Sequence, residues 1–115
     1  LGRPRKVLAL AEGIETALSV CLGTGLPCWA CVCAHGLASV EIPVGVQEVL
    51  IFEDKDCSGT GQKAARKLRK RLQQSGISAR IVSIREEIPA GAKGIDVNDI
   101  LCWYGKEAVA EMLCD

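Results

Sequence analysis

The sequence predicts an α/β domain with a central parallel sheet of about four strands flanked by helices. Two observations lead to this fold class. Short apolar runs alternate along the chain with longer segments of helical periodicity, the pattern of a parallel sheet with helical crossovers. Hydrophobic residues make up 49% of the 115 residues, enough for a single buried core. We expect residues 1–115 to form one domain excised from a longer protein, because Leu1 is not an initiator methionine.

The first half of the chain contains three predicted strands and one predicted helix. The strands are residues 7–11, 28–34 and 48–52, the helix is residues 14–22, and residues 35–43 form a short helical or irregular connection. Each strand segment is an apolar run of the kind found in buried parallel strands. In the helix, Ala17, Leu18 and Cys21 are expected to face the core. Gly23 and Gly25 end the helix, and Pro27 prevents its return.

The second half of the chain predicts three helices and one strand. The helices are residues 61–74, 98–103 and 106–114, and the strand is residues 78–84. Ala64, Leu68 and Leu72 recur at intervals of four, the spacing of an apolar helix face. Gly76 then caps this helix. The resulting order of strand, helix, strand, strand, helix and strand is that of a small parallel sheet.

The most informative segment of the chain is residues 49–59. Its apolar run ends in Asp54 and Asp56, and Gly59 then opens a basic helix. Residues two apart in a strand share a face, so we expect the two carboxylates ~7 Å apart at the carboxyl end of a strand, where open α/β sheets bind ligands. Adjacent acids resist joint ionisation unless a cation offsets them. The segment therefore predicts a site for Mg²⁺, with Mn²⁺ as an alternative ion, suited to phosphate chemistry.

Two further acidic pairs occupy equivalent places, after a strand or in a late loop. They are Glu12 with Glu15, and Asp96 with Asp99. We expect all three clusters to converge at one sheet edge, the arrangement used for phosphoryl transfer and phosphodiester cleavage. Each cluster also has an ordinary explanation. Residues 54–56 could form a solvated turn with a helix cap, and Glu12 could be an acidic residue that the helix dipole favours at the start of a helix. Asp96 and Asp99 could be a capping pair. Their joint occurrence favours the metal site.

A run of six cations follows the aspartates within the predicted helix. They are Lys63, Arg66, Lys67, Arg69, Lys70 and Arg71. Two interpretations stay open: a solvated outer face, or a surface that guides template or nucleotide phosphates toward the acids. The cations at 69–71 are expected to lie too far along the helix to reach the acids themselves.

Composition bounds the remaining possibilities. With 14 basic and 14 acidic residues the chain is formally neutral, so overall charge gives no argument for nucleic-acid binding. Glu12 and Glu15 interrupt the apolar stretch at residues 7–34, which excludes a membrane span there, and no signal peptide is visible. The seven cysteines are therefore expected to be reduced thiols of a cytoplasmic protein. The spacing of Cys28, Cys31 and Cys33 near His35 favours packing in a buried strand over a zinc site.

Three segments of the chain resemble the motifs of Toprim domains. Residues 11–19 (Ala-Glu-Gly-Ile-Glu-Thr-Ala-Leu-Ser) look like the first motif, a glutamate followed by glycine between strand and helix. Residues 50–59 are similar to the Asp-x-Asp motif with its following glycine, and residues 94–101 resemble the segment that closes these domains in primases. The resemblance runs from about residue 6 to residue 104. It implies the Rossmann-like Toprim fold and is closest to primases or primase-helicases of phages, plasmids and integrated mobile elements.

The resemblance also implies roles for individual residues. The catalytic residues would be Glu12, as acid or base, Asp54 and Asp56, and the metal would be held by these three and Asp96. Nucleotide phosphates would be bound by Gly13, Gly59, Lys55 and Lys63. The site would be supported by Glu15, Asn98 and Asp99. One position departs from the pattern, because Ile95 stands where a lysine is expected before Asp96.

The function that the resemblance implies is that of a DNA primase. Such an enzyme joins nucleoside triphosphates into an RNA primer on a single-stranded DNA template with Mg²⁺, and a helicase domain or subunit would be a further partner in the parent protein. Two alternatives stay open. A Toprim nuclease would use the same acids to activate water, and a non-catalytic module would only bind nucleic acid or a partner. The charge pattern does not separate polymerisation from cleavage.

Overall fold

The structure is a computed structural model that describes residues 6–114. Residues 1–5 and 115, which the predicted domain includes, lie outside the described residues. The elements are β1 (Val7–Ala11), α1 (Ile14–Thr24), β2 (Cys28–Ala30), α2 (Ala34–Ser39), β3 (Glu48–Phe52), β4 (Lys55–Asp56), α3 (Thr60–Gln74), β5 (Ser78–Val82), β6 (Gly94–Ile95), α4 (Val97–Tyr104) and α5 (Lys106–Glu111). Among these residues no helix is long and apolar enough to cross a membrane.

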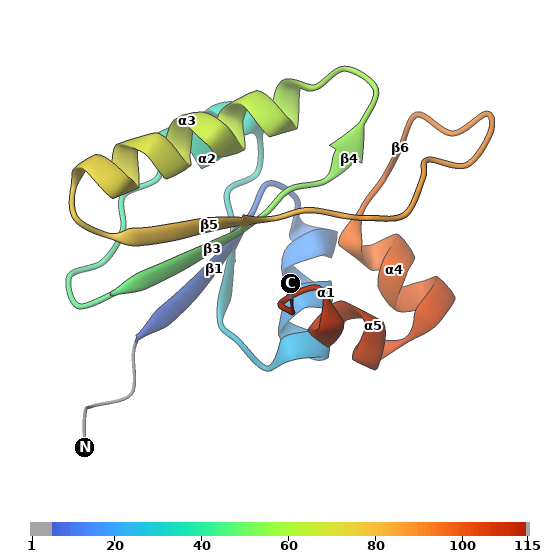
Figure 1. The fold of residues 1–115 in the computed structure, drawn as a ribbon, viewed down its shortest axis with the longest axis horizontal. Coiled ribbons are helices and arrows are strands. Elements are labelled where there is room, and N and C mark those ends of the chain that lie inside the picture. Colours follow the sequence, from blue (N-terminus) through green and yellow to red (C-terminus); the bar gives the residue numbers. More distant parts are fainter. Residues whose placement is uncertain (1–5, 115) are drawn as a thin grey trace.

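The predicted parallel sheet is confirmed. Four strands pair in the order β2-β1-β3-β5, and every pairing in this sheet is parallel. The chain moves from β1 to β2 on one side and then crosses to β3 on the other. Because crossovers in parallel sheets are right-handed, this reversal places α1 on one face and α2 with α3 on the opposite face; α4 and α5 join α1 (Figure 1).

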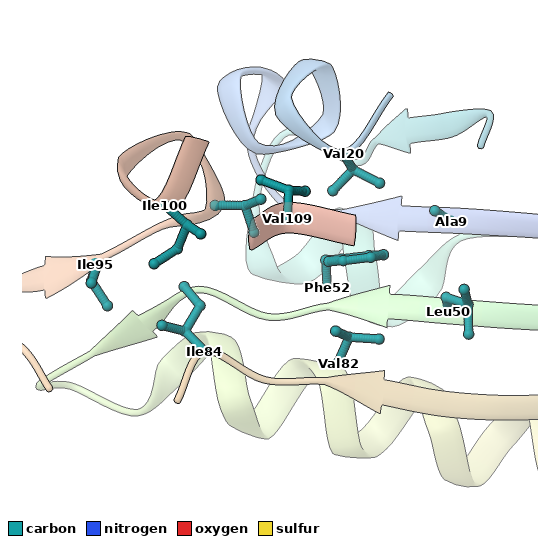
Figure 2. Packing of buried hydrophobic residues seen from close by; sticks show 10 residues of the cluster. Ala9, Val20, Leu50, Phe52, Val82, Ile84, Ile95, Ile100 and Val109 are labelled. Atoms are coloured by element: carbon teal, nitrogen blue, oxygen red, sulfur yellow. The ribbon is translucent and has the colours of Figure 1, made fainter. Parts of the chain in front are cut away.

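The core is divided into two layers by the sheet. Successive residues of β1 and β3 point to opposite faces, so Leu8, Leu10, Val49 and Ile51 pack beneath α2 and α3. The other layer lies between the sheet and α1, α4 and α5. There, Ala9, Leu50, Phe52 and Val82 of the strands meet Val20, Ile100 and Val109 of the helices (Figure 2). Strands buried on both faces explain the unbroken apolar runs in the sequence.

Two predicted strands are shorter than expected, for the same physical reason. β2 ends at Ala30 instead of residue 34, because its only partner, β1, ends at Ala11. After one further bond, from Cys31 N–H to the Ala11 carbonyl at 2.8 Å, the chain leaves the sheet. β5 similarly stops at Val82, opposite the last residue of β3. Hydrophobicity alone therefore overestimated the length of the two outer strands.

The cysteines differ from the expectation of a buried strand. All seven are free thiols. Cys28 and Cys31 are partly buried, and burial followed by neighbouring thiols raises the pKa of Cys28 to about 12. Cys33 is exposed and caps α2 by accepting a hydrogen bond from the Gly36 N–H at 3.4 Å. The packing predicted for Cys33 is wrong because it lies beyond the end of β2, at the start of the next helix.

The predicted inner face of α1 is also wrong in part. Leu18 is 59% exposed, and the buried residues are Thr16, Ala17, Ser19 and Val20. Two polar side chains are buried here because each has an internal hydrogen-bond partner. The apolar residues Ile14, Leu18 and Leu22 instead form an exposed stripe along the helix.

We predict that Leu68→Ala lowers the free energy of unfolding by roughly 2–5 kcal/mol, because truncation of a buried leucine leaves a cavity. Leu68 lies on α3 and is 0% exposed. Leu18→Ala makes the same chemical change on an exposed face and should alter stability by less than about 0.5 kcal/mol. Urea unfolding of both variants measures the difference. Equal losses would mean that Leu18 faces the core after all.

Candidate active site

The candidate active site lies where the order of the strands reverses. Ala11 and Phe52 are paired as the last residues of β1 and β3, so Glu12, one residue past β1, and Asp54, two residues past β3, follow the strand ends at the same edge of the sheet. Ligands of open α/β sheets bind at this reversal, beyond the carboxyl ends of the strands. A pocket of about 310 Å³ occupies the position. It is lined by Glu12, Gly13, Val32, Asp54, Lys55, Asp56, Gly94, Ile95, Asp96 and Asp99.

Asp96 reaches this pocket through a second, two-stranded sheet. β4 pairs antiparallel with β6, with Lys55 opposite Ile95 and Asp56 opposite Gly94. The pairing places Asp96 beside the Asp-x-Asp segment from a distant part of the chain. It also corrects one expectation. Asp54 and Asp56 do not share a strand, since β3 ends at Phe52 and Asp56 belongs to β4; both nevertheless line the pocket.

Asp54 is the most perturbed carboxylate of the site. Its Oδ1 accepts a hydrogen bond from the Thr16 hydroxyl at 2.9 Å. Burial raises the pKa of Asp54 to about 6; the Thr16 bond opposes this shift, and the nearby carboxylates of Asp96, Glu12 and Asp56 add to it. These three acids therefore lie close enough for their charges to act on Asp54.

Asp56 has the opposite environment. Its Oδ1 accepts hydrogen bonds from the Ser58 hydroxyl at 2.7 Å and the Gly59 N–H at 2.8 Å. These bonds lower the pKa of Asp56 below its ordinary value, because they favour the charged form. Gly59 precedes α3 with φ of +75°, a conformation that glycine adopts without strain. The Ser58 hydroxyl and, after it, the Gly59 N–H thus favour the charged form of Asp56.

Asp96 and Asp99 form the capping pair that the sequence left open. The Asp96 side chain accepts from the Asp99 N–H, and the Asp99 side chain accepts from the Asp96 N–H, both at 2.9 Å. This capping box starts α4. Burial, as the main cause, raises the pKa of Asp96. Capping and lining the pocket are compatible, since the cap occupies one oxygen of Asp96.

Glu12 lies against the first turn of α3. A methyl group added at Gly61 would come within 3.3 Å of Glu12 Oε2 and 3.8 Å of Asp56 Oδ2. Gly61 therefore leaves room for two of the site carboxylates beside the helix start, where the helix dipole favours negative charge. Gly61 was not among the residues predicted for the site; the available signal was a glycine in the first turn of an otherwise strong helix.

The remaining predicted site residues divide into two groups. Gly13 lines the pocket, and Glu15 lines a neighbouring pocket of about 300 Å³. Lys55 also lines the main pocket, but its Nζ donates to the Glu86 carbonyl at 2.8 Å. Gly59, Lys63 and Asn98 line neither pocket. Asn98 instead accepts a hydrogen bond from the Ser19 hydroxyl at 3.3 Å.

Two residues of the site had no signal in the sequence. Thr16 is 2% exposed and bonds to Asp54, but its spacing in α1 looked like that of any helical threonine. Val32 lines both pockets and has φ of +74°, the one positive φ outside glycine in the described chain. For a β-branched residue this conformation is strained, and such strain gathers at functional sites.

Comparison with known proteins identifies the family. The Toprim domain profile matches residues 7–107, nearly the whole chain. The chain belongs to the Toprim family. No curated protein sequence and no solved structure matches it significantly.

Toprim domains are shared by primases, topoisomerases and nucleases, typically catalyse phosphoryl transfer, and generally bind Mg²⁺. The donor set of this Toprim pocket suits that ion, because carboxylate oxygens are the ligands that Mg²⁺ prefers. Asp54 and Asp56 each use one oxygen in internal hydrogen bonds, which leaves the second oxygen for an ion. Within residues 6–114 no three acidic, His or Cys side chains are close enough to hold a metal as they stand. Binding would therefore require these side chains to turn toward a common point.

We predict that Asp54→Asn and Asp56→Asn shift stability in opposite directions near neutral pH without divalent ions. The raised pKa of Asp54, about 6, means that the folded state retains a proton that the unfolded chain releases from pH ~4 upward. Stability thus falls as pH rises through this window, and Asp54→Asn should melt at a higher temperature than wild type. The lowered pKa of Asp56 gives stability above the unfolded pKa, so Asp56→Asn should melt lower.

Thermal unfolding in EDTA at about pH 7 and about pH 4 tests this pair of variants. The Asp54→Asn difference should shrink at the acidic pH, because Asp54 is then protonated in the folded state. The Asp56→Asn difference should largely persist, because the lowered pKa of Asp56 keeps it ionised until the pH falls below its ordinary pKa. Shifts of equal sign near pH 7 would contradict this account of the two aspartates.

We also predict that Thr16→Val raises the pKa of Asp54 above its present value of about 6, because the Thr16 hydrogen bond lowers it. NMR titration of the Asp54 carboxyl carbon measures the change. Thr24→Val is the matched control: its hydroxyl donates to the Val20 carbonyl at 2.6 Å and does not contact Asp54. An unchanged Asp54 titration in Thr16→Val would show that this bond has no electrostatic effect.

Proposed function

We propose that this Toprim domain catalyses Mg²⁺-dependent nucleotidyl transfer as the core of a DNA primase, of the type found in phages, plasmids and mobile elements. In this role it synthesises RNA primers from nucleoside triphosphates on single-stranded DNA, as part of a longer cytoplasmic protein that also holds or recruits a helicase. The motif at residues 94–101 supports the primase assignment within the family, because it resembles the segment that closes primase Toprim domains.

One observation carries the proposal. Glu12, Asp54, Asp56 and Asp96 come from three separate stretches of the chain and line one pocket at the reversal of the strand order. Their charges raise the pKa of Asp54 in addition to the effect of burial. A pocket that concentrates negative charge in this way is suited to a cation and, through it, to a triphosphate.

Each residue then has a distinct part in the reaction. Mg²⁺, when bound, would neutralise phosphate charge and orient the triphosphate. Asp54, Asp56 and Asp96 would hold the ion with their second oxygens. The 3′-hydroxyl of the primer attacks the α-phosphate, pyrophosphate leaves, and the Glu12 carboxylate accepts the hydroxyl proton. Glu12 suits this role because no hydrogen bond fixes its side chain in the described chain, and its Oε2, like Asp56 Oδ2, lies against Gly61.

Mg²⁺ titration followed by backbone amide NMR is the first test. Shifts confined to residues around Glu12, Asp54, Asp56 and Asp96 are expected, with Kd weakened in Asp54→Asn. Glu53→Gln is the matched control, since Glu53 is the neighbouring acid, accepts a bond from the Ser83 hydroxyl and does not line the pocket. Shifts scattered over exposed acids, or equal in both variants, would contradict a shared ion site.

In the protein that carries this domain, we predict that Asp54→Asn or Asp56→Asn reduces template-dependent ribonucleotide incorporation about 100-fold or more, because the metal's charge stabilisation is worth several kcal/mol. Glu53→Gln should retain activity. Release of pyrophosphate from nucleoside triphosphates distinguishes polymerisation from cleavage. Strand cleavage without nucleotide dependence would replace the primase proposal with a Toprim nuclease, and full activity of either aspartate variant would remove the ion site.

A further inference from the structure

We infer that the outer face of α3 is the binding surface for a single nucleic-acid strand that leads into the acidic pocket. The surface consists of four exposed cations, Lys63, Arg66, Lys67 and Lys70, and we call it the α3 cationic stripe. The inference deepens the proposed function, on which it rests, by assigning the surface that would hold the template.

The stripe is a face of one sign with no internal compensation. The 15 residues of α3 contain six cations and no acid. Arg71 is committed to the fold, since its guanidinium donates to the Ala38 and Val40 carbonyls. Within residues 6–114, the side chains of the four stripe residues make no hydrogen bond or ion pair. Their positive charge is therefore available to an outside partner.

An ordinary solvated helix face would not be built in this way. Surface helices usually mix charges of both signs, because opposite charges three or four residues apart stabilise a helix and like charges destabilise it. Lys63 with Lys67 and Arg66 with Lys70 are like-charged pairs at a spacing of four. The like charges of the stripe thus oppose helix stability. Burial of the other face of α3 against the core maintains the helix; the buried residues are Ala64, Ala65, Leu68 and Leu72.

The charge of the whole domain is polarised by this helix. The chain is neutral, with 14 basic and 14 acidic residues, so the six cations of α3 leave the rest of the chain with a net charge of about −6. A polyanion is attracted to the α3 face and repelled elsewhere, including at the acidic pocket. This polarity would orient an approaching strand before any specific contact forms.

The position and length of the stripe match a strand that ends at the pocket. α3 starts at Thr60, next to Gly59, whose N–H donates to Asp56. The helix then runs away from β4 along the sheet (Figure 1), and β4 contributes Lys55 and Asp56 to the pocket. From Lys63 to Lys70 the helix rises about 10 Å, long enough for the stripe to contact more than one phosphate of a strand. A strand that lies on the stripe thus has one end directed at Asp56 and the pocket.

A binding experiment in EDTA tests the stripe separately from catalysis. The probe is a fluorescein-labelled oligo(dT), with affinity measured by anisotropy at several salt concentrations. Each cation that neutralises a phosphate of a single strand contributes about −0.7 to the slope of log K against log salt. Arg66→Gln/Lys70→Gln should therefore flatten the slope by about 1.4 and weaken binding about 15-fold at ~0.15 M salt.

The matched control is Lys6→Gln/Lys106→Gln, which removes the same charge from two exposed lysines off α3. This variant should bind like wild type. Equal losses in both double variants would reduce the effect to net charge, and no loss in either would remove the stripe; both results overturn the inference. Equal affinity for a DNA duplex, or equal competition by polyglutamate per charge, would overturn the assignment to a single strand.

The outcomes also separate this inference from the proposed function. If Arg66→Gln/Lys70→Gln binds oligo(dT) normally while the parent protein synthesises primers, the stripe is wrong and the primase proposal stands. If the stripe variant loses binding as expected but Asp54→Asn retains primer synthesis, the stripe stands and the proposed chemistry is wrong. Circular dichroism of the double variant controls for folding, and removal of like charges should leave α3 intact.

Discussion

The parallel pairing of β1 with β3 determines where the chemistry of this domain is located. The two strands pair over five residues, with Ala11 opposite Phe52, and both are buried on two faces. The segments that follow the two strands must therefore leave the sheet at the same edge, and the reversal of strand order beside this pair leaves a crevice above them. Glu12 and Asp54 are positioned by the backbone of the sheet. Their side chains contribute little to the core, which lies below them in two apolar layers.

The candidate site is a source of instability that this core offsets. Burial and three neighbouring carboxylates raise the pKa of Asp54, which means that its ionised form is disfavoured in the folded state. Val32 adds a strained backbone, of order 1–3 kcal/mol for such a conformation, at the wall of the same pocket. Both features lie at one edge of the sheet. Burial of Leu68 and Leu72 against the opposite face is independent of that edge, so the fold can tolerate a site that opposes it.

The sequence was sufficient for the parts of the structure that hydrophobic burial decides. β1 and β3 follow their apolar runs to within one residue, because both are central strands with polar or charged residues on either side. Features that depend on pairing with another strand could not be predicted from the sequence. β2 stops when β1 has no more residues to pair, and β4 and β6, two residues each, are too short for a periodic pattern. Thr16 and Gly61 belong to the site only because α1 and α3 bring them to Asp54 and Glu12. Such contacts between distant elements depend on the tertiary structure and leave no local pattern in the sequence.

The distribution of charge suggests why binding and chemistry are carried by different elements. A pocket lined by five acids repels a nucleic-acid strand, so it cannot supply affinity until a cation reverses its local charge. α3 carries its cations on the face opposite its buried leucines, where they can attract phosphates without pairing with the site acids and cancelling them. The cationic helix and the site acids meet at the start of α3. There, Gly61 has no side chain that would crowd the carboxylates of Glu12 and Asp56, and the Gly59 N–H donates to Asp56. Because the cations of α3 lie apart from the acids of the pocket, the helix keeps its attraction for a polyanion and the pocket keeps its affinity for a cation.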